Sequence, residues 1–414
     1  MLALYPDFEF DAKCPRCCST LRARRWLVPG MRNLAQAQCT TCDGMFYVDL
    51  PAGQASLTPV IMDARSGEAF SSAGAGWFAQ WLSDSYARRR KTPPAVREEL
   101  FRTLRRPILL NCLDTLYGHE LMKLMNAQYY LDSCVEKDLV VLIHANFRWL
   151  VPNGVAAIWT LQEPLSKGTD WNDGLAEFVR SRLTACEEAW LARAVNLPHA
   201  DDFDIERFTG VKPFPRGDFF AWVAAMQSPK VVFVCRDDRG WFGGTAIAEF
   251  FGRVARGLSR RGIPLRGLVR LLQHRAIAAF GSLLRREYPG LEMTVIGVGQ
   301  PGGLHGWIKD LRSIQPTDEN EVETCRCCAE AHLVIGVHGS NMLIPTAHAG
   351  AVIDLMPRDR WDNIGQDIVL PMGEAREQAL RAVFLPTNTT AGLLAHITSS
   401  TLRYAHHILR IQTV

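Results

Sequence analysis

The fold is decided by the stretch LVIGVHGSNML at residues 333–343, an apolar run that ends in a His-Gly-Ser-Asn turn. A second apolar run, AVIDLM at residues 351–356, follows and ends at Pro357. Together they predict a buried parallel strand, a tight turn, a short helix and the next strand. Ligands of open α/β sheets bind beyond the carboxyl ends of the strands, which makes this turn a candidate ligand site. Gly339 allows close backbone approach to a phosphate or sugar, and the helix that follows offers N–H groups to an anion. The plainer interpretation is an ordinary turn with a structural histidine.

The block around this turn resembles the donor-site segment of GT-B glycosyltransferases, closest to glycosyltransferase family 61. The resemblance covers residues 228–360, and Ser340 stands where the family typically has the alanine of an HGA motif. It implies an inverting, metal-independent enzyme that moves a sugar from a nucleoside-diphosphate sugar to an acceptor hydroxyl. It also implies that the turn binds the donor, through His338, Gly339, Ser340 and Asn341.

Two arginines follow the predicted strand KVVFVCR at residues 230–236. Guanidinium groups bind phosphate oxygens in a planar fork, so Arg236 and Arg239 suit a diphosphate. The family has a comparable strand followed by S/C-R-x-x-x-R, which implies donor binding by Arg236, whereas the spacing to Arg239 is shorter here. The alternative is a surface turn in which Asp237 and Asp238 neutralise the two arginines.

Composition limits the classes of function. The chain has 414 residues, 48% hydrophobic and 21% charged, which is enough for the cores of two or three domains. Its net charge of +3 argues against wholesale nucleic-acid binding. The amino terminus contains Asp7 and Glu9 and lacks a long apolar run, so no secretory signal is expected. No segment approaches about 18 uninterrupted apolar residues, which predicts no transmembrane segment and a cytoplasmic protein.

Two CxxC motifs near the amino terminus predict a zinc ribbon. Cys14 and Cys17 form the first motif, and Cys39 and Cys42 form the second. Zinc prefers four thiolates in a tetrahedron, and the lack of a secretory signal favours metal binding over disulfides. Cys18 is an alternative ligand beside Cys17. Four sulfur ligands leave no open coordination position, so the expected zinc is structural and no catalytic metal is expected.

The sequence predicts an α/β protein with two Rossmann-like domains, as in GT-B enzymes, preceded by a small zinc ribbon. Strands alternate with helical stretches after residue 106, beginning with PILLNCL at 107–113 and VVLIH at 140–144, which is typical of a parallel sheet. The predicted segments are a zinc ribbon at 1–55, a connector with a helix at 56–105, an acceptor domain at 106–225, a nucleotide-sugar domain at 226–385 and a carboxyl-terminal helix at 386–414.

The sequence does not identify a single catalytic base. In GT-B enzymes the first domain binds the acceptor, so the resemblance implies that Gly118 and His119 line the cleft; equally, His119 caps a helix. Displacing a diphosphate needs a base for the acceptor hydroxyl and positive charge for the leaving group. The candidates for the base are Asp237, Asp238, His119 and His338, with an aspartate preferred.

Two other functions fit the sequence. Asp310-Leu311-Arg312 suggests a heptosyltransferase-like GT-B enzyme, although the turn at residues 338–341 replaces that family's acidic-Ser-Gly-Pro turn. The second alternative is a non-catalytic protein whose zinc ribbon recruits a protein partner to an α/β scaffold. The enzyme is expected to bind a nucleoside-diphosphate sugar and a glycan, protein or small-molecule acceptor. Convergence of Arg236 and His338 on one site would favour the enzyme.

Overall fold

The computed structural model of the chain contains two compact units, Met1–Phe208 and Thr209–Val414, which we describe separately. It describes residues 1–72, 74–194, 203–236, 239–246, 250–251, 254, 257, 266–369, 379 and 381–412. The division lies earlier than the boundary at residue 225 that the sequence suggested. The reason is that Phe214 and Trp222 pack in the core of the second unit.

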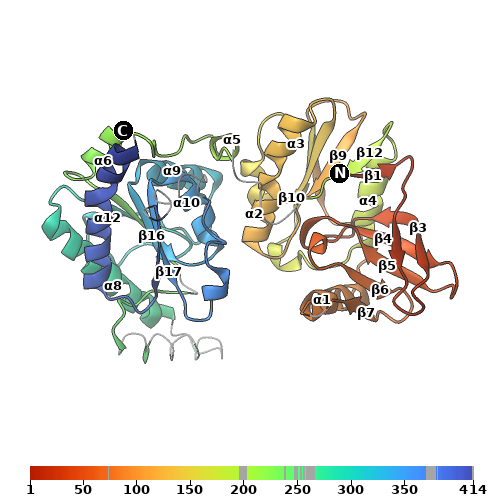
Figure 1. Cartoon of the computed structure of the whole chain (residues 1–414), viewed down its shortest axis with the longest axis horizontal. Coiled ribbons are helices and arrows are strands. Elements are labelled where there is room, and N and C mark those ends of the chain that lie inside the picture. Colours follow the sequence, from red (N-terminus) through yellow and green to blue (C-terminus); the bar gives the residue numbers. More distant parts are fainter. Residues whose placement is uncertain are drawn as a thin grey trace. The chain divides into compact units, whose positions relative to one another are not determined.

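The cysteine motifs lie in a six-stranded antiparallel sheet, in which each strand pairs with the next along the chain (Figure 1). Its strands are β2 (Asp11–Lys13), β3 (Thr20–Leu27), β4 (Leu34–Cys39), β5 (Met45–Asp49), β6 (Val60–Asp63) and β7 (Ala69–Ser71). The 3-10 helix η1 (Gly53–Ser56) precedes β6, and helix α1 (Gly76–Ala87) packs against β6 and β7. The segment 56–105, expected to be a connector, therefore supplies two strands of this sheet as well as its helix.

The second sheet of the first unit has four parallel inner strands and an antiparallel strand at each edge. In spatial order its strands are β1 (Leu2–Tyr5), β12 (Ala189–Leu191), β9 (Pro107–Asn111), β10 (Asp138–His144), β11 (Ala157–Leu161) and β8 (Val96–Leu100). The accompanying helices are α2 (Tyr117–Met125), α3 (Ala127–Ser133), η2 (Ala145–Leu150), η3 (Leu165–Lys167) and α4 (Asp173–Leu183); α5 (Glu206–Thr209) spans the division between the units. The predicted strands at 107–113 and 140–144 are confirmed as β9 and β10.

The second unit is built on a six-stranded, fully parallel sheet. In spatial order its strands are β15 (Ile308–Asp310), β14 (Glu292–Ile296), β13 (Lys230–Val234), β16 (Leu333–Val337), β17 (Ala351–Met356) and β18 (Ala382–Pro386). Numbered along the chain, the order is 3-2-1-4-5-6, as in Rossmann-type nucleotide-binding sheets. The strand order reverses between β13 and β16, the two strands that the sequence singled out.

Helices cover both faces of this parallel sheet. They are α6 (Phe219–Ala224), α8 (Arg266–Glu287), α9 (Asp318–Glu330), η4 (Ser340–Met342), α10 (Leu343–His348), η5 (Trp361–Asn363) and α12 (Ala391–Gln412). Helices α8 and α12 lie side by side in Figure 1, and α9 packs against α10. Phe233 of β13 shares a core with Phe280 and Leu402, whereas its neighbour Val232 shares another core with Cys328. Successive side chains of a strand point to opposite faces, which explains why these strands are apolar throughout.

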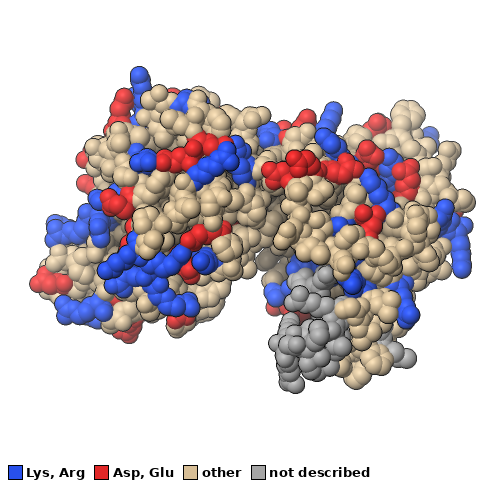
Figure 2. All heavy atoms as spheres, turned by 180° about the vertical axis from the view of Figure 1, so that it is seen from behind, with Lys and Arg blue, Asp and Glu red and all other residues tan. Residues whose placement is uncertain are grey.

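The surface carries both signs of charge. Figure 2 shows acidic side chains next to basic ones on the face that it presents, in keeping with the net charge of +3. None of the helices among the described residues combines the length and the apolar character that crossing a bilayer requires.

Candidate functional site

The first candidate site is a cluster of four cysteine sulfurs in the antiparallel sheet. Cys14 and Cys17 lie in the turn between β2 and β3, and Cys39 and Cys42 lie where β4 turns into β5. Their Sγ atoms all lie within 4.8 Å of one another, with 3.8 Å between Cys14 and Cys42 and 3.4 Å between Cys17 and Cys39. A zinc tetrahedron with bonds of about 2.3 Å has edges of about 3.8 Å. The four sulfurs are therefore close enough to hold one metal ion.

The surroundings of the cluster favour thiolates. The backbone N–H groups of Thr41 and Cys42 donate to the sulfur of Cys39 over 3.4 and 3.5 Å. Hydrogen bonds from the backbone of Ser19 and, to a smaller extent, from its side chain lower the pKa of the Cys17 thiol to about 6. Such donors stabilise the charged form that a metal requires. The backbone N–H of Gly44 lowers the pKa of the Cys42 thiol, but hydrogen bonds shared with the other three sulfurs outweigh it and raise this pKa to about 11.

Cys18, the alternative ligand, is not part of this cluster. Its side chain is exposed, and its backbone has a φ of 60°, with its N–H donating to the Cys14 carbonyl over 2.9 Å. It therefore closes the turn that brings Cys14 and Cys17 together. The set Cys14, Cys17, Cys39 and Cys42 is the one that the structure assembles.

The second candidate site lies in the second unit, at the carboxyl ends of β13 and β16. Arg236 follows β13, and the turn His338–Asn341 follows β16. The guanidinium of Arg236 donates to Asn341 Oδ1 over 2.7 Å, and Arg239 donates to the backbone carbonyl of His338 over 3.0 Å. Arg236 and Arg239 therefore both contact the turn at residues 338–341.

Gly339 is needed where Arg236 crosses the turn. Its φ of +146° is a backbone conformation that residues with side chains rarely adopt, and a Cβ there would overlap Nη1 of Arg236. The glycine predicted to allow close approach to a ligand thus allows close approach of an arginine side chain.

The backbone N–H groups of the turn are mostly used within the protein. The N–H of Gly339 donates to Asp367 Oδ2 over 2.7 Å, and those of Met342 and Leu343 donate to carbonyls of the same turn. The helix expected near Asn341 is η4 followed by the six-residue α10. The sequence-based expectation that this helix offers its N–H groups to an anion is therefore wrong for the N–H groups of Met342 and Leu343. Charge at the site comes from side chains instead.

His338 is held by two carboxylates that the sequence analysis missed. Its Nδ1 lies 2.9 Å from Asp354 Oδ2 and 3.0 Å from Asp367 Oδ1. All three side chains are buried, with exposed fractions of 5%, 0% and 4%. Asp354 was visible as a charged residue inside the apolar run 351–356, whereas Asp367 follows η5 in a segment without any motif. These groups could also hold a cation, because their ligand atoms lie within 4.8 Å of one another.

Several buried polar atoms at this site lack a protein partner. Among the residues that the structure describes, Asn341 Nδ2 donates no hydrogen bond and Asp354 Oδ1 accepts none. Unpartnered buried polar atoms are rare in folded proteins, because each costs free energy. A polar ligand that pairs with Asn341 would remove part of that cost.

The other predicted site residues have different outcomes. Asp237 and Asp238 lie outside the described residues. Ser340 begins η4. His119 is the third residue of α2 in the first unit, where about a third of its side chain is exposed and its Nδ1 lies 3.7 Å from Asp114 Oδ1. Gly118 is buried beside it.

A buried charge network surrounds His119. Asp114 accepts from Lys123 over 2.8 Å, and although burial opposes this, Lys123 and His119 hold the pKa of its carboxyl below the usual range. Glu120 contacts His144 Nδ1 over 2.6 Å. These residues lie at or beyond the carboxyl ends of β9 and β10, at the edge where ligands of parallel sheets bind. The sequence analysis missed all of them except His119, since none belongs to a recognisable motif.

The motif Asp310-Leu311-Arg312 has a structural role. Arg312 pairs with Asp310 over 2.7 Å and donates to the carbonyl of Gly302 over 2.9 Å. It thereby holds the glycine-rich loop at residues 297–303, and the heptosyltransferase-like alternative stays a prediction.

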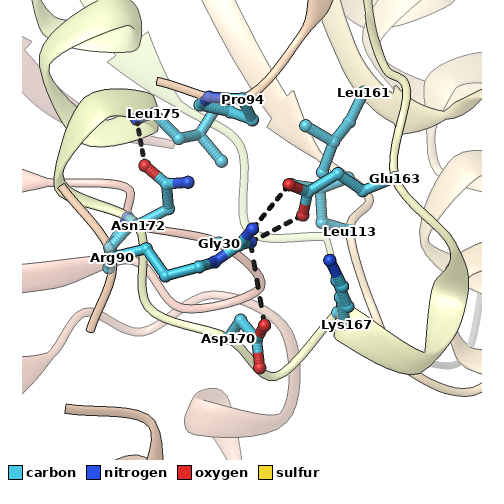
Figure 3. Close-up of a pocket in the computed structure, with 12 residues that line it drawn as sticks. Gly30, Arg90, Pro94, Leu113, Leu161, Glu163, Lys167, Asp170, Asn172 and Leu175 are labelled. Atoms are coloured by element: carbon cyan, nitrogen blue, oxygen red, sulfur yellow. Dashed lines mark hydrogen bonds and ion pairs between the residues drawn. The ribbon is translucent and has the colours of Figure 1, made fainter. Parts of the chain in front are cut away.

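A crevice in the first unit is too small for a substrate. Figure 3 shows Arg90 pointing at Glu163, with contacts of 2.8 and 2.7 Å, and Asp170 lies 3.7 Å from the same guanidinium. The space between them is about 10 Å³, which is room for one water molecule. Its charges pair with one another, so we assign it no ligand.

Comparison of the chain with family models, curated proteins and solved structures yields no match. Assignment of the site therefore depends on its geometry and chemistry.

Proposed function

We propose that this protein is an inverting, metal-independent glycosyltransferase that binds a nucleoside-diphosphate sugar at the carboxyl ends of β13 and β16. The observation that carries the proposal is the contact between Arg236 and Asn341 at the point where the strand order reverses. Ligands of open parallel sheets bind at that point. The resemblance of residues 228–360 to family 61 enzymes supports the same assignment.

The chemistry of the site suits a diphosphate leaving group. Arg236 and Arg239 bring two guanidinium groups to one turn, and charge-assisted hydrogen bonds from such groups stabilise negative charge on phosphate oxygens. Asn341 orients Arg236 through its carbonyl and keeps a buried amide nitrogen without a protein partner among the described residues. This convergence favours an enzyme over a scaffold that only recruits partners, because a scaffold has no need of it.

The resemblance to GT-B enzymes implies that the acceptor binds to the first unit, in which His119 lies beyond the carboxyl end of β9. His119 is exposed enough to meet a hydroxyl and stands next to the buried carboxylate of Asp114. A histidine with a carboxylate beside one ring nitrogen is suited to accept a proton at the other. His119 therefore stays a candidate base beside Asp237, Asp238 and His338.

We also propose that the four-cysteine cluster holds a structural zinc ion. Four sulfurs at tetrahedral spacing complete the coordination of zinc and leave no position for a substrate. Bound there, the ion would tie β2, β3, β4 and β5 together at their turns. The cluster has no part in the transfer reaction.

Binding of nucleoside diphosphates tests the proposal directly. The diphosphates of adenosine, cytidine, guanosine and uridine are added separately while thermal unfolding is followed. A ligand at a hundred times its Kd stabilises the protein by about 2.7 kcal/mol, which raises the melting temperature of the unit that binds it. Arg236→Ala should abolish the shift, whereas Arg326→Ala, which removes an exposed arginine of α9, should keep it. No shift with any of the four nucleotides would contradict the proposed function.

A further inference from the structure

The ring of His338 has one nitrogen whose protonation follows from geometry. Nδ1 lies at hydrogen-bonding distance from one oxygen of Asp354 and one oxygen of Asp367. A carboxylate accepts hydrogen bonds and has none to give, so Nδ1 carries the hydrogen. Among the described residues, no protein atom forms a hydrogen bond with Nε2, the second ring nitrogen. Nε2 is therefore the ring atom left for a ligand.

The charge balance at this point favours a doubly protonated ring. With a neutral imidazole, two buried carboxylates would share one hydrogen and repel each other. An imidazolium compensates one of those charges where little water is present to do so. Burial of His338 lowers its pKa, but the two aspartates outweigh burial and raise it to about 9. Burial raises the pKa of Asp354 to about 6, which keeps that carboxyl mainly ionised at neutral pH.

Within the described part of the chain, the other charged groups that contact the turn at His338 are basic. Arg239 binds its backbone carbonyl, and Arg236 crosses Gly339 next to it. Asp237 and Asp238 lie outside the described residues. Basic neighbours oppose an imidazolium, and the direct contacts to Asp354 and Asp367 are what offset them. The three cations also gather positive charge at the end of β16.

We propose that Asp354 and Asp367 hold His338 as an imidazolium, whose Nε2 hydrogen bonds to a phosphate oxygen of the departing nucleoside diphosphate. This inference rests on the proposed function. The hydrogen stays on Nε2 throughout, and no bond of the ring is made or broken. His338 consequently stabilises the leaving group and is unable to act as the base. Asp354 and Asp367 are positioning residues, because they act through the ring.

The protonation of His338 is measurable without any ligand. The 414-residue chain is labelled with ¹⁵N in its histidines, and the ring signals of His338 are identified by their loss in His338→Gln. Both ring nitrogens should be protonated at pH 7, with a titration midpoint near 9. In Asp354→Asn the midpoint should fall by about one unit or more, because one opposite charge is removed. Asp359→Asn, which changes an exposed aspartate of the loop after β17, should leave it unchanged.

Binding of the diphosphate tests the second half of the inference. The probe is whichever of the four nucleoside diphosphates gives the largest thermal shift, used above pH 7.5 where its phosphates are ionised. Its affinity should be level in the wild type between pH 7.5 and 8.5. In Asp354→Asn it should fall as pH rises over the same range, by about ten-fold or more once the ring is neutral. Asp367→Asn is the second variant to use if Asp354→Asn does not fold.

The outcomes separate this inference from the proposed function. A ring that is neutral in the wild type at pH 7 would overturn the inference, whatever nucleotides bind. Broadening of the His338 signals by stoichiometric Mn²⁺ would overturn it too, since the three residues would then be a cation site. An imidazolium in a protein that binds no nucleoside diphosphate would remove the proposed function and the phosphate contact together. If the nucleotide affinity of Asp354→Asn does not change with pH, only the contact between His338 Nε2 and the phosphate is refuted.

Discussion

The guanidinium of Arg236 donates to the side-chain carbonyl of Asn341 over 2.7 Å, although 105 residues separate the two in sequence. Their strands, β13 and β16, are neighbours in the parallel sheet, with Val234 paired to Gly336. Parallel strands end at the same edge, so residues that follow them meet there. The contact joins the segment after β13 and the turn after β16 into one site.

Arg236 and Asn341 are expected to act together in donor binding. Arg236→Ala removes a charged partner of the diphosphate, and such contacts are worth about 1.5–3 kcal/mol. We therefore expect kcat/KM to fall about ten- to a hundred-fold. Asn341→Ala should cost part of the same free energy, and the double variant should cost less than the sum. Strictly additive losses would show that Asn341 does not orient Arg236.

Gly339→Ala is expected to weaken donor binding more than it weakens the fold. The added methyl group would overlap Nη1 of Arg236, and a flexible side-chain end can move away. The backbone strain at φ +146° costs on the order of 1–3 kcal/mol. Gly306→Ala is the matched control, because its Cβ would meet open space. Nucleotide affinity is measured by calorimetry and stability by thermal unfolding; full affinity in folded Gly339→Ala would contradict the assigned role of Arg236.

Cys39→Ser is expected to release zinc and destabilise the antiparallel sheet. Metal binding to a structural site is part of the free energy of folding, so losing one of four ligands lowers the melting temperature of the first unit. Cys18→Ser removes a neighbouring exposed cysteine outside the cluster and should retain one zinc per chain. Elemental analysis gives the zinc content of both variants. Equal zinc loss in the two would return Cys18 to the list of ligands.

Turnover is expected to survive chelation during a short assay with EDTA. Side-chain cations, rather than a divalent ion, meet the charge of the diphosphate in the proposed mechanism. Zinc content is measured in parallel, to establish that the cysteine cluster keeps its ion. Activity that is lost and then restored by Mn²⁺ or Mg²⁺ would refute metal-independent transfer and direct attention to Asp354 and Asp367.

His338 should make stability depend on pH between about 6.5 and 9. Its pKa is about 6.5 in the unfolded chain and about 9 in the folded protein, so folding favours the protonated ring. This contribution is complete below pH 6.5 and is lost as pH rises through 9; at 1.36 kcal/mol for each pKa unit it is on the order of 3 kcal/mol. Asp354, with a raised pKa of about 6, titrates below this range. The free energy of unfolding should therefore fall more between pH 6.5 and 9 in the wild type than in His338→Gln. An equal fall in the two proteins would contradict the prediction.

Much of the local structure was predictable from the sequence. Apolar runs at 107–113, 140–144, 230–236 and 333–337 are strands, because strands buried on both faces are apolar throughout. The CxxC motifs identified the four clustered cysteines, since the turn of each motif already places two sulfurs together. Arg236 and His338 were found for a similar reason, as polar residues directly after buried strands.

The sequence by itself determined which residues form strands and turns and which carry suitable chemistry, because periodicity, glycine and CxxC spacing act over a few residues. Only the tertiary structure decided which of these residues meet. Asp354 and Asp367 reach His338, Glu120 reaches His144, and Arg236 reaches Asn341 through strand pairing and loop packing. Contacts of that kind depend on strand order in the sheet, which no local pattern encodes. The protonation of His338 is decided at the same level, because it follows from two carboxylates, one 16 residues and the other 29 residues further along the chain.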